Sequence, residues 1–94
     1  MDVYVYQSAF LCEDCAMKVS ADRAPSDDSD QYPVGPYPDG GGEADCPHHC
    51  DHCGLFLRNP LTGDGERYIQ AQIAQSPLTY TTRAWLDFYR PVID

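Results

Sequence analysis

Two Cys-x2-Cys pairs constrain the fold of this chain more than any other feature of its sequence. The first pair is Cys12 and Cys15, and the second is Cys50 and Cys53. A two-residue spacer lets one tight turn aim two thiolates at the same ion, and Zn²⁺ binds four such ligands in a tetrahedron. The sequence therefore predicts a four-cysteine zinc site that joins two distant parts of the chain.

The chain is short and has little material for a hydrophobic core. It has 94 residues, among them eight prolines and seven glycines. A domain of this size buries only about 60–65% of the surface that its unfolded form exposes, so a cross-link is expected. A structural zinc ion would supply one, because its apparent binding free energy is about 10–16 kcal/mol. We expect residues 1–94 to form a single zinc-binding domain that is largely unfolded without metal.

A secreted disulfide framework is the competing explanation for the cysteines. Five cysteines leave one thiol over, and the opening Met-Asp-Val-Tyr-Val-Tyr lacks the basic region and long apolar run of a signal peptide. No stretch approaches the roughly 18 apolar residues of a membrane span. We therefore expect a cytoplasmic protein with reduced thiols and no membrane segment.

The second cysteine pair lies in a stretch that offers further metal ligands. Cys46 and all three histidines, His48, His49 and His52, lie within four residues of Cys50. Each could replace one thiolate, because imidazole and thiolate both bind zinc. His52 is expected to point outward from its turn, whereas His49 could support its neighbour through a hydrogen bond. The two Cys-x2-Cys pairs remain the preferred ligands, with Cys46 and His49 as the alternatives.

Three enzymatic interpretations use residues of the same stretches. Cys46, Cys50 and Cys53 have the spacing that holds an iron–sulfur cluster in radical S-adenosylmethionine enzymes, but the chain is too short for the barrel of those enzymes. A redox Cys-x2-Cys pair would require alternating strands and helices, which the sequence does not supply. A zinc-dependent hydrolase would need an open ligand position, with Glu43 or Asp45 as the base. Two complete cysteine pairs leave no such position, so a closed structural site is favoured.

The pattern of apolar residues predicts an α+β fold with a short antiparallel sheet. Residues 2–11 alternate and then become continuously apolar, which indicates one strand that leads into the first cysteine pair. Residues 16–24 could form two helical turns, with Met17 and Val19 turned inward. The apolar triplet 55–57 is expected to form a short strand that pairs with the first one. A glycine after the last cysteine would leave room for backbone N–H groups near the sulfurs.

Two C-terminal helices are expected to cover this sheet. The first runs from Gly65 to about Gln75 and is capped by Asp64, and the second starts at Ser76-Pro77 and ends before Pro91. Apolar residues recur at helical spacing in the second helix and predict a buried stripe with Trp85 behind the metal site. The stripe consists of Leu78, Trp85, Leu86, Phe88 and Tyr89.

Residues 26–45 are acidic and rich in proline and glycine, and their composition predicts one long loop. A calcium site could be built from the carboxylates of Asp27, Asp28 and Asp30. Their spacing, however, lacks the ligand order of a calcium-binding loop. A solvated acidic face is therefore the better explanation.

The formal net charge of −9 bears on the partner. Binding to nucleic acid depends on lysine and arginine that release counterions, so a nucleic-acid-binding zinc ribbon is the less favoured alternative. We expect a non-enzymatic structural module that binds a protein partner of basic character.

Two runs of the sequence also carry a resemblance. Residues 35–45 read Gly-Pro-Tyr-Pro-Asp-Gly-Gly-Gly-Glu-Ala-Asp, and residues 49–62 read His-Cys-Asp-His-Cys-Gly-Leu-Phe-Leu-Arg-Asn-Pro-Leu-Thr. The chain resembles small uncharacterised phage and bacterial zinc-ribbon-like proteins that combine this segment with an N-terminal Cys-x2-Cys pair. The resemblance extends over most of the chain, including a C-terminal helix with Trp and Tyr. It implies a zinc-ribbon-like fold with the two cysteine pairs as metal positions and Cys46 as an addition, and it implies no particular activity.

Overall fold

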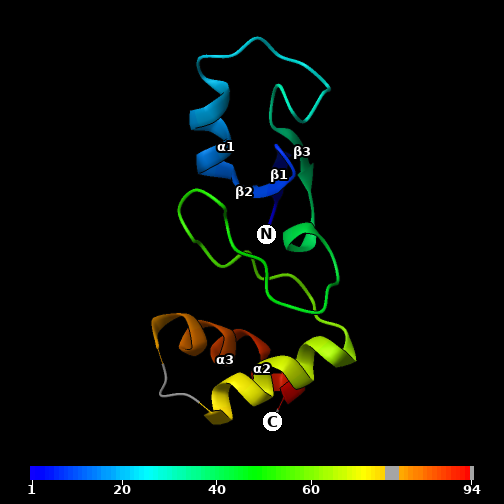
Figure 1. The fold of residues 1–94 in the computed structure, drawn as a ribbon, viewed down its shortest axis with the longest axis vertical. Coiled ribbons are helices and arrows are strands. Elements are labelled where there is room, and N and C mark those ends of the chain that lie inside the picture. The colour runs from blue at the N-terminus through cyan, green and yellow to red at the C-terminus, as the bar shows by residue number, and fades with distance from the viewer. Residues whose placement is uncertain (76–78, 94) are drawn as a thin grey trace.

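The computed structural model of the chain describes residues 1–75 and 79–93. It shows a small α+β protein with a three-stranded antiparallel sheet and three α-helices, two of them C-terminal (Figure 1). The predicted fold class is thereby confirmed. The molecule is elongated, with extents of 46 × 23 × 18 Å and a radius of gyration of 14.6 Å. A compact chain of this length would have a radius of gyration of about 12 Å.

The sheet is built around an N-terminal hairpin. Strands β1 (Val3–Tyr6) and β2 (Ala9–Cys12) pair with each other, and β3 (Val34–Tyr37) pairs with the other side of β1. The expectation of a single strand over this region is wrong, because the chain reverses at Gln7 and Ser8, whose φ angles are 50° and 64°. Two successive residues with positive φ give the type of turn that matches the twist of a hairpin.

The stretch expected to be one long loop contains regular structure. Strand β3 and the short 3₁₀ turn η1 (Asp39–Gly41) lie within it. The prolines in this stretch are compatible with β3 because it is an edge strand, where a missing N–H costs little. Gly40 has a φ of 62°, and a Cβ atom there would lie 2.3 Å from the carbonyl oxygen of Leu57. Only glycine allows this close approach between η1 and the later loop.

Helix α1 (Glu13–Ser20) begins immediately after β2, three residues earlier than expected. This start places Cys15 and Ala16 on the buried face, with Val19 packed beside them. Met17 is 63% exposed, so the expectation that it turns inward is wrong. The earlier start changes which side of the helix faces the sheet.

The apolar triplet 55–57 does not join the sheet. Phe56 instead forms an isolated antiparallel bridge with His49. The loop reaches the sheet through another residue, since the amide of Asp51 donates to the carbonyl of Phe10 over 2.9 Å. The expected pairing of residues 55–57 with the first strand is therefore wrong.

The C-terminal helices α2 (Gly63–Gln75) and α3 (Tyr80–Ile93) pack against each other. Thr62, and not Asp64, caps α2, because its hydroxyl accepts a hydrogen bond of 3.1 Å from the amide of Gly65. Helix α3 continues beyond Pro91, so its predicted end is also wrong; a proline disfavours the helical conformation of the residue before it but does not forbid it. The expected start at Ser76-Pro77, and Leu78, lie outside the described residues.

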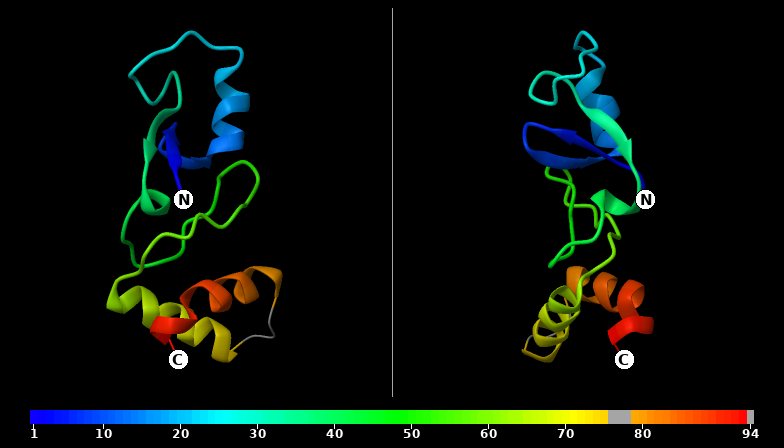
Figure 2. Two further views of the ribbon diagram at one scale, coloured as in Figure 1. Left: turned by 180° about the vertical axis from the view of Figure 1, so that it is seen from behind. Right: turned by 90° about the vertical axis from the view of Figure 1, so that its right-hand side faces the viewer.

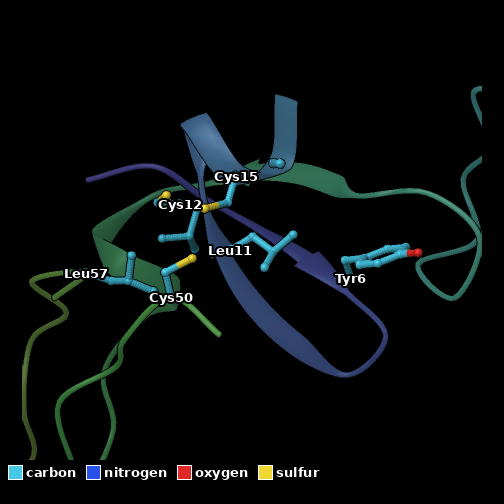
Figure 3. Packing of buried hydrophobic residues seen from close by; sticks show 8 residues of the cluster. Tyr6, Leu11, Cys12, Cys15, Cys50 and Leu57 are labelled. Atoms are coloured by element: carbon cyan, nitrogen blue, oxygen red, sulfur yellow. The ribbon is translucent and has the colours of Figure 1, made fainter. Parts of the chain in front are cut away.

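The two C-terminal helices do not cover the sheet. They lie beyond the loop of residues 42–62, at the opposite end of the molecule from the strands (Figures 1 and 2). The structure accordingly has two hydrophobic clusters. The first lies between the sheet and α1 (Figure 3) and contains Val3, Tyr6, Leu11, Cys12, Cys15, Ala16, Cys50 and Leu57. The second contains Phe56, Ile69 and Tyr89, with Leu61, Ala84 and Trp85 packed against it.

The loop supplies residues to both clusters. Leu57 is completely buried in the first, while its neighbour Phe56 is buried in the second. Adjacent side chains in an extended segment point to opposite sides, which lets one segment serve both clusters. The loop therefore holds the sheet and the helix pair together.

Candidate metal centre

The structure brings together all four cysteines of the two predicted pairs. The Sγ atoms of Cys12, Cys15, Cys50 and Cys53 lie within 4.8 Å of one another, and those of Cys12 and Cys53 are 3.7 Å apart. Four thiolates at about 2.3 Å from a tetrahedral zinc ion would lie about 3.8 Å from each other. The arrangement therefore fits a single tetrahedral metal ion.

The first pair occupies the junction between β2 and α1. Cys12 is the last residue of β2, where it pairs with Val3, and Cys15 lies in the first turn of α1. The free N–H groups at the start of a helix favour negative charge, which suits thiolate ligands. Figure 3 shows the sulfur atoms of this pair and of Cys50 directed toward the same space.

The second pair lies in residues 50–54, which we call the knuckle. The amide of Cys50 donates to the carbonyl of Leu55 over 2.8 Å, and the amide of Gly54 donates to the carbonyl of Cys50 over 2.9 Å. Gly54 has a φ of 78°, and no atom lies within 4 Å of the position a Cβ would take. Glycine is thus required here by the backbone angle and not, as expected, by the need for space around N–H groups.

The thiols differ in exposure. Cys12, Cys15 and Cys50 are buried in the first hydrophobic cluster, whereas Cys53 is exposed at its edge. Cys53 is therefore the most accessible residue of the centre.

The thiols also differ in acidity. Burial raises the pKa of Cys15 well above its ordinary value, and it raises the pKa of Cys12, partly opposed by a backbone hydrogen bond from Cys15. Burial would raise the pKa of Cys50 as well, but backbone hydrogen bonds from Cys12, Cys53 and His52 outweigh it and lower the pKa to about 6. Cys50 is therefore the thiol of the cluster that ionises most readily, and a bound cation would favour deprotonation of the others.

His49 supports the knuckle. Its Nδ1 lies 2.9 Å from the carbonyl of Gly54 and must donate to it, while its Nε2 accepts the indole N–H of Trp85 at 3.0 Å. Both ring nitrogens are therefore engaged, so His49 does not replace a thiolate in this arrangement. The second hydrogen bond joins Trp85 of α3 to the residue before Cys50, although Trp85 packs against the second hydrophobic cluster. Of the apolar stripe predicted to be buried, Tyr89 is buried, but Phe88 is 42% exposed, so that part of the prediction is wrong.

The other residues considered as ligands lie outside the four-thiol cluster. Cys46 is exposed and does not join it, so the iron–sulfur spacing is not assembled into a site. His48 stacks on Phe10 with ring centroids 4.7 Å apart, and its Nδ1 lies 2.9 Å from the carbonyl of Gly40. His52 is exposed, as expected.

The two carboxylates considered as catalytic bases are not built into the centre. Glu43 is exposed, and the carboxylate of Asp45 accepts a hydrogen bond from the hydroxyl of Thr62 at the start of α2. Among residues 1–75 and 79–93, the four cysteines are the group of histidine, cysteine and acidic side chains placed to share one ion.

Sequence reasoning missed the role of Asn59, which it treated only as part of a turn. Asn59 is completely buried. Its side-chain oxygen accepts the amide of His48 at 2.7 Å, and its side-chain nitrogen donates to the carbonyl of Cys46 at 3.0 Å. The hydroxyl of Tyr89 donates to the backbone carbonyl of Asn59. An asparagine before a proline carries no sequence signal for such a role, because the signal lies in its tertiary partners.

Comparison with protein families, curated proteins and solved structures finds no match to this chain. Fold and site define it as a small α+β protein with a four-thiol centre. Within the described ranges, no helix has the length and apolar character needed to cross a membrane.

Proposed function

We propose that the four-thiol centre binds one Zn²⁺ ion and that this ion is structural. The observation that carries this proposal is the convergence of four cysteine sulfurs, three of them buried, within 4.8 Å of one another. An all-thiolate tetrahedral set suits zinc and is unsuited to Mg²⁺ or Ca²⁺, which prefer oxygen ligands in larger numbers.

Four protein ligands would complete the tetrahedral coordination of the ion. Catalytic zinc sites have three protein ligands and bind water or substrate in the remaining position. Asp45 is also not placed to act as a catalytic base, because its carboxylate accepts a hydrogen bond from the hydroxyl of Thr62. A non-enzymatic role is therefore favoured.

The ion would cross-link segments that are distant in the sequence. It would tie the junction of β2 and α1 to the knuckle, and the knuckle is tied to α3 through His49 and Trp85. A rigid centre of this kind would present the surrounding surface in a fixed shape, as an interaction module requires.

The charge of the chain supports a protein partner over a nucleic acid. The formal net charge is −9, with six basic residues. Two of these pair with acidic neighbours on their own helices, Arg67 with Asp64 and Arg90 with Asp87. Phosphate binding needs clustered and available basic side chains, so a basic protein partner is the better fit.

Replacing the metal with Co²⁺ tests whether the site is closed. Tetrahedral cobalt bound to four thiolates gives intense visible absorption, which changes when an external ligand binds to the ion. We expect the tetrathiolate spectrum and no change upon addition of cyanide or azide. A spectrum that responds to these anions at concentrations that leave the cobalt bound would show an open position and would favour the zinc-dependent hydrolase.

A further inference from the structure

A groove runs between the knuckle and α3. Its volume is about 680 Å³, and apolar side chains from both sides line it, with Leu55 and Phe56 from the loop and Ala84 and Phe88 from α3. Leu55 is 46% exposed and Phe88 is 42% exposed. Apolar side chains that remain accessible around one hollow mark interaction sites more often than isolated exposed ones do.

A second hollow of about 470 Å³ lies on the other side of Phe88. Its apolar lining includes Leu61 and Tyr89, and its acidic lining consists of Asp39 and Glu66. Arg58 and Phe88 line both hollows, so the two adjoin. Each has the size of a typical ligand-binding site, about 300–1,000 Å³.

We call the two adjoining hollows the double hollow, and the charges around them indicate what kind of molecule binds there. Asp39 and Glu66 form no ion pair within the part of the chain that the structure describes, where the ion pairs join Arg67 to Asp64 and Arg90 to Asp87. A second copy of this chain would bring its own charge of −9, and nucleic acids and anionic membranes would also be repelled. A basic polypeptide is the occupant that complements the overall charge and the two carboxylates of the second hollow, which outnumber its one cation, Arg58.

We propose that the double hollow is the docking site for a basic segment of a partner protein. A large apolar side chain of that segment enters the groove beside Leu55 and Phe88. A lysine or arginine enters the second hollow, where its aliphatic stem packs on Leu61 and its charged group reaches Glu66 and Asp39. This inference rests on the proposed function, because the zinc ion would hold the knuckle side of the groove in place.

The proposal is tested with a short amphipathic peptide of leucine and lysine, titrated into the zinc-loaded, isotope-labelled chain and followed by NMR. We expect saturable binding, with the largest shifts at Leu55, Phe88 and Glu66. A peptide with glutamate in place of lysine, and one with serine in place of leucine, should each bind at least about tenfold more weakly.

Matched variants distinguish binding of the peptide at this site from a general attraction of a basic peptide to an acidic protein. Phe88→Ser, and Asp39→Asn combined with Glu66→Gln, should each weaken binding about tenfold. Tyr37→Ser changes an aromatic side chain of β3 that is equally exposed, at 43%, and should leave the affinity unchanged. Asp22→Asn combined with Asp27→Asn removes two exposed carboxylates away from both hollows and is the corresponding control for charge.

Several outcomes would overturn the docking site. They are the absence of binding, equal binding of the glutamate peptide, shifts centred away from the two hollows, and a Phe88→Ser variant that binds as wild type. Self-association that Phe88→Ser abolishes would instead identify a second copy as the occupant. Metal content is measured in every sample. A zinc-loaded chain that does not bind the peptide therefore contradicts the docking site and leaves the zinc proposal intact. A chain that takes up no zinc when the ion is supplied, yet binds the peptide in the groove, contradicts the zinc proposal alone.

Discussion

Asn59 connects three parts of the chain through one buried residue. Its side chain joins the loop before the knuckle at Cys46 and His48, and its carbonyl accepts the hydroxyl of Tyr89 from α3. Asn59→Ala should lower the free energy of unfolding by about 2–4 kcal/mol, because it leaves the amide of His48 and the carbonyl of Cys46 without partners in a partly buried setting. Urea denaturation of the zinc-loaded chain measures this loss.

Gln31→Ala is the matched control, because Gln31 is exposed and only its backbone forms a described hydrogen bond. It should change the free energy of unfolding by less than about 0.5 kcal/mol. If both variants lose the same small amount, Asn59 does not connect the parts of the loop.

The hydroxyl of Tyr89 predicts a dependence of stability on pH. Burial raises the pKa of this phenol above its ordinary value of 10.0, and the nearby thiol of Cys46 adds to the shift. The folded state therefore favours the protonated phenol, so its contribution to stability is complete below about pH 10 and is lost as the pH rises further. Urea denaturation at pH 8 and near pH 11 should show this loss.

Tyr89→Phe should remove this part of the pH dependence. At pH 8 the variant should lose about 1 kcal/mol because one hydrogen bond is missing. Near pH 11 the gap between variant and wild type should shrink. A gap that stays constant would mean that the phenol does not ionise at different pH values in the folded and unfolded states.

At the level of single residues, the sequence predicted which four cysteines converge and that His49 supports them, but not the tertiary partners of His49 and Asn59. Cys-x2-Cys spacing identifies metal ligands because the geometry is local. The hydrogen bonds of His49 to Trp85 and of Asn59 to Tyr89 join residues 36 and 30 positions apart. No local pattern encodes contacts of this kind.

Among the elements, the turns depend on two glycines for different reasons. Gly54 has a positive φ but open space around it, whereas Gly40 has a positive φ and a crowded environment. Gly54→Ala should therefore cost about 1–2 kcal/mol from backbone strain alone. Gly40→Ala should cost at least about 3 kcal/mol, because its Cβ would also meet the carbonyl of Leu57.

Gly63→Ala at the start of α2 is the control for these two variants. Gly63 lacks the positive φ, and a Cβ there would approach only the side chain of Arg67, at 3.8 Å. Its replacement should be neutral or should stabilise the chain by up to about 1 kcal/mol. Thermal unfolding compares the three variants, and an equal loss in all of them would contradict the distinction.

The elements themselves were only partly predictable. Helix α2 follows from local composition, and the predicted span of residues 65–75 lies within it. The hairpin was missed because Gln7 and Ser8 adopt positive φ angles without glycine, which leaves no turn signal in the sequence. Strand β3 was missed because its partner β1 lies some 30 residues earlier, and pairing across such a distance overrides a loop-like composition.

At the level of the whole molecule, the knuckle is the joint between two clusters. Cys12 and Cys15 of the first cluster meet the thiols of the knuckle, while His49 connects the knuckle to Trp85, which packs against the second cluster. Removal of zinc should therefore unfold the sheet region and also change the fluorescence of the single tryptophan. Circular dichroism and fluorescence during titration with a chelator measure both effects.

The Cys46→Ser variant should respond to the chelator as wild type does, because Cys46 lies outside the cluster. If circular dichroism and fluorescence stay unchanged after metal analysis shows the ion to be gone, the ion does not hold the fold together.

Metal content in cysteine variants tests the four-thiol centre most directly. Native mass spectrometry with metal analysis compares wild type, Cys46→Ser and Cys50→Ser. We expect one zinc ion per chain in wild type and in Cys46→Ser, and loss of the ion in Cys50→Ser. Of the two replaced cysteines, Cys50 belongs to the cluster of four converging sulfurs and Cys46 does not. Loss of zinc from Cys46→Ser, or its retention in Cys50→Ser, would contradict this ligand set.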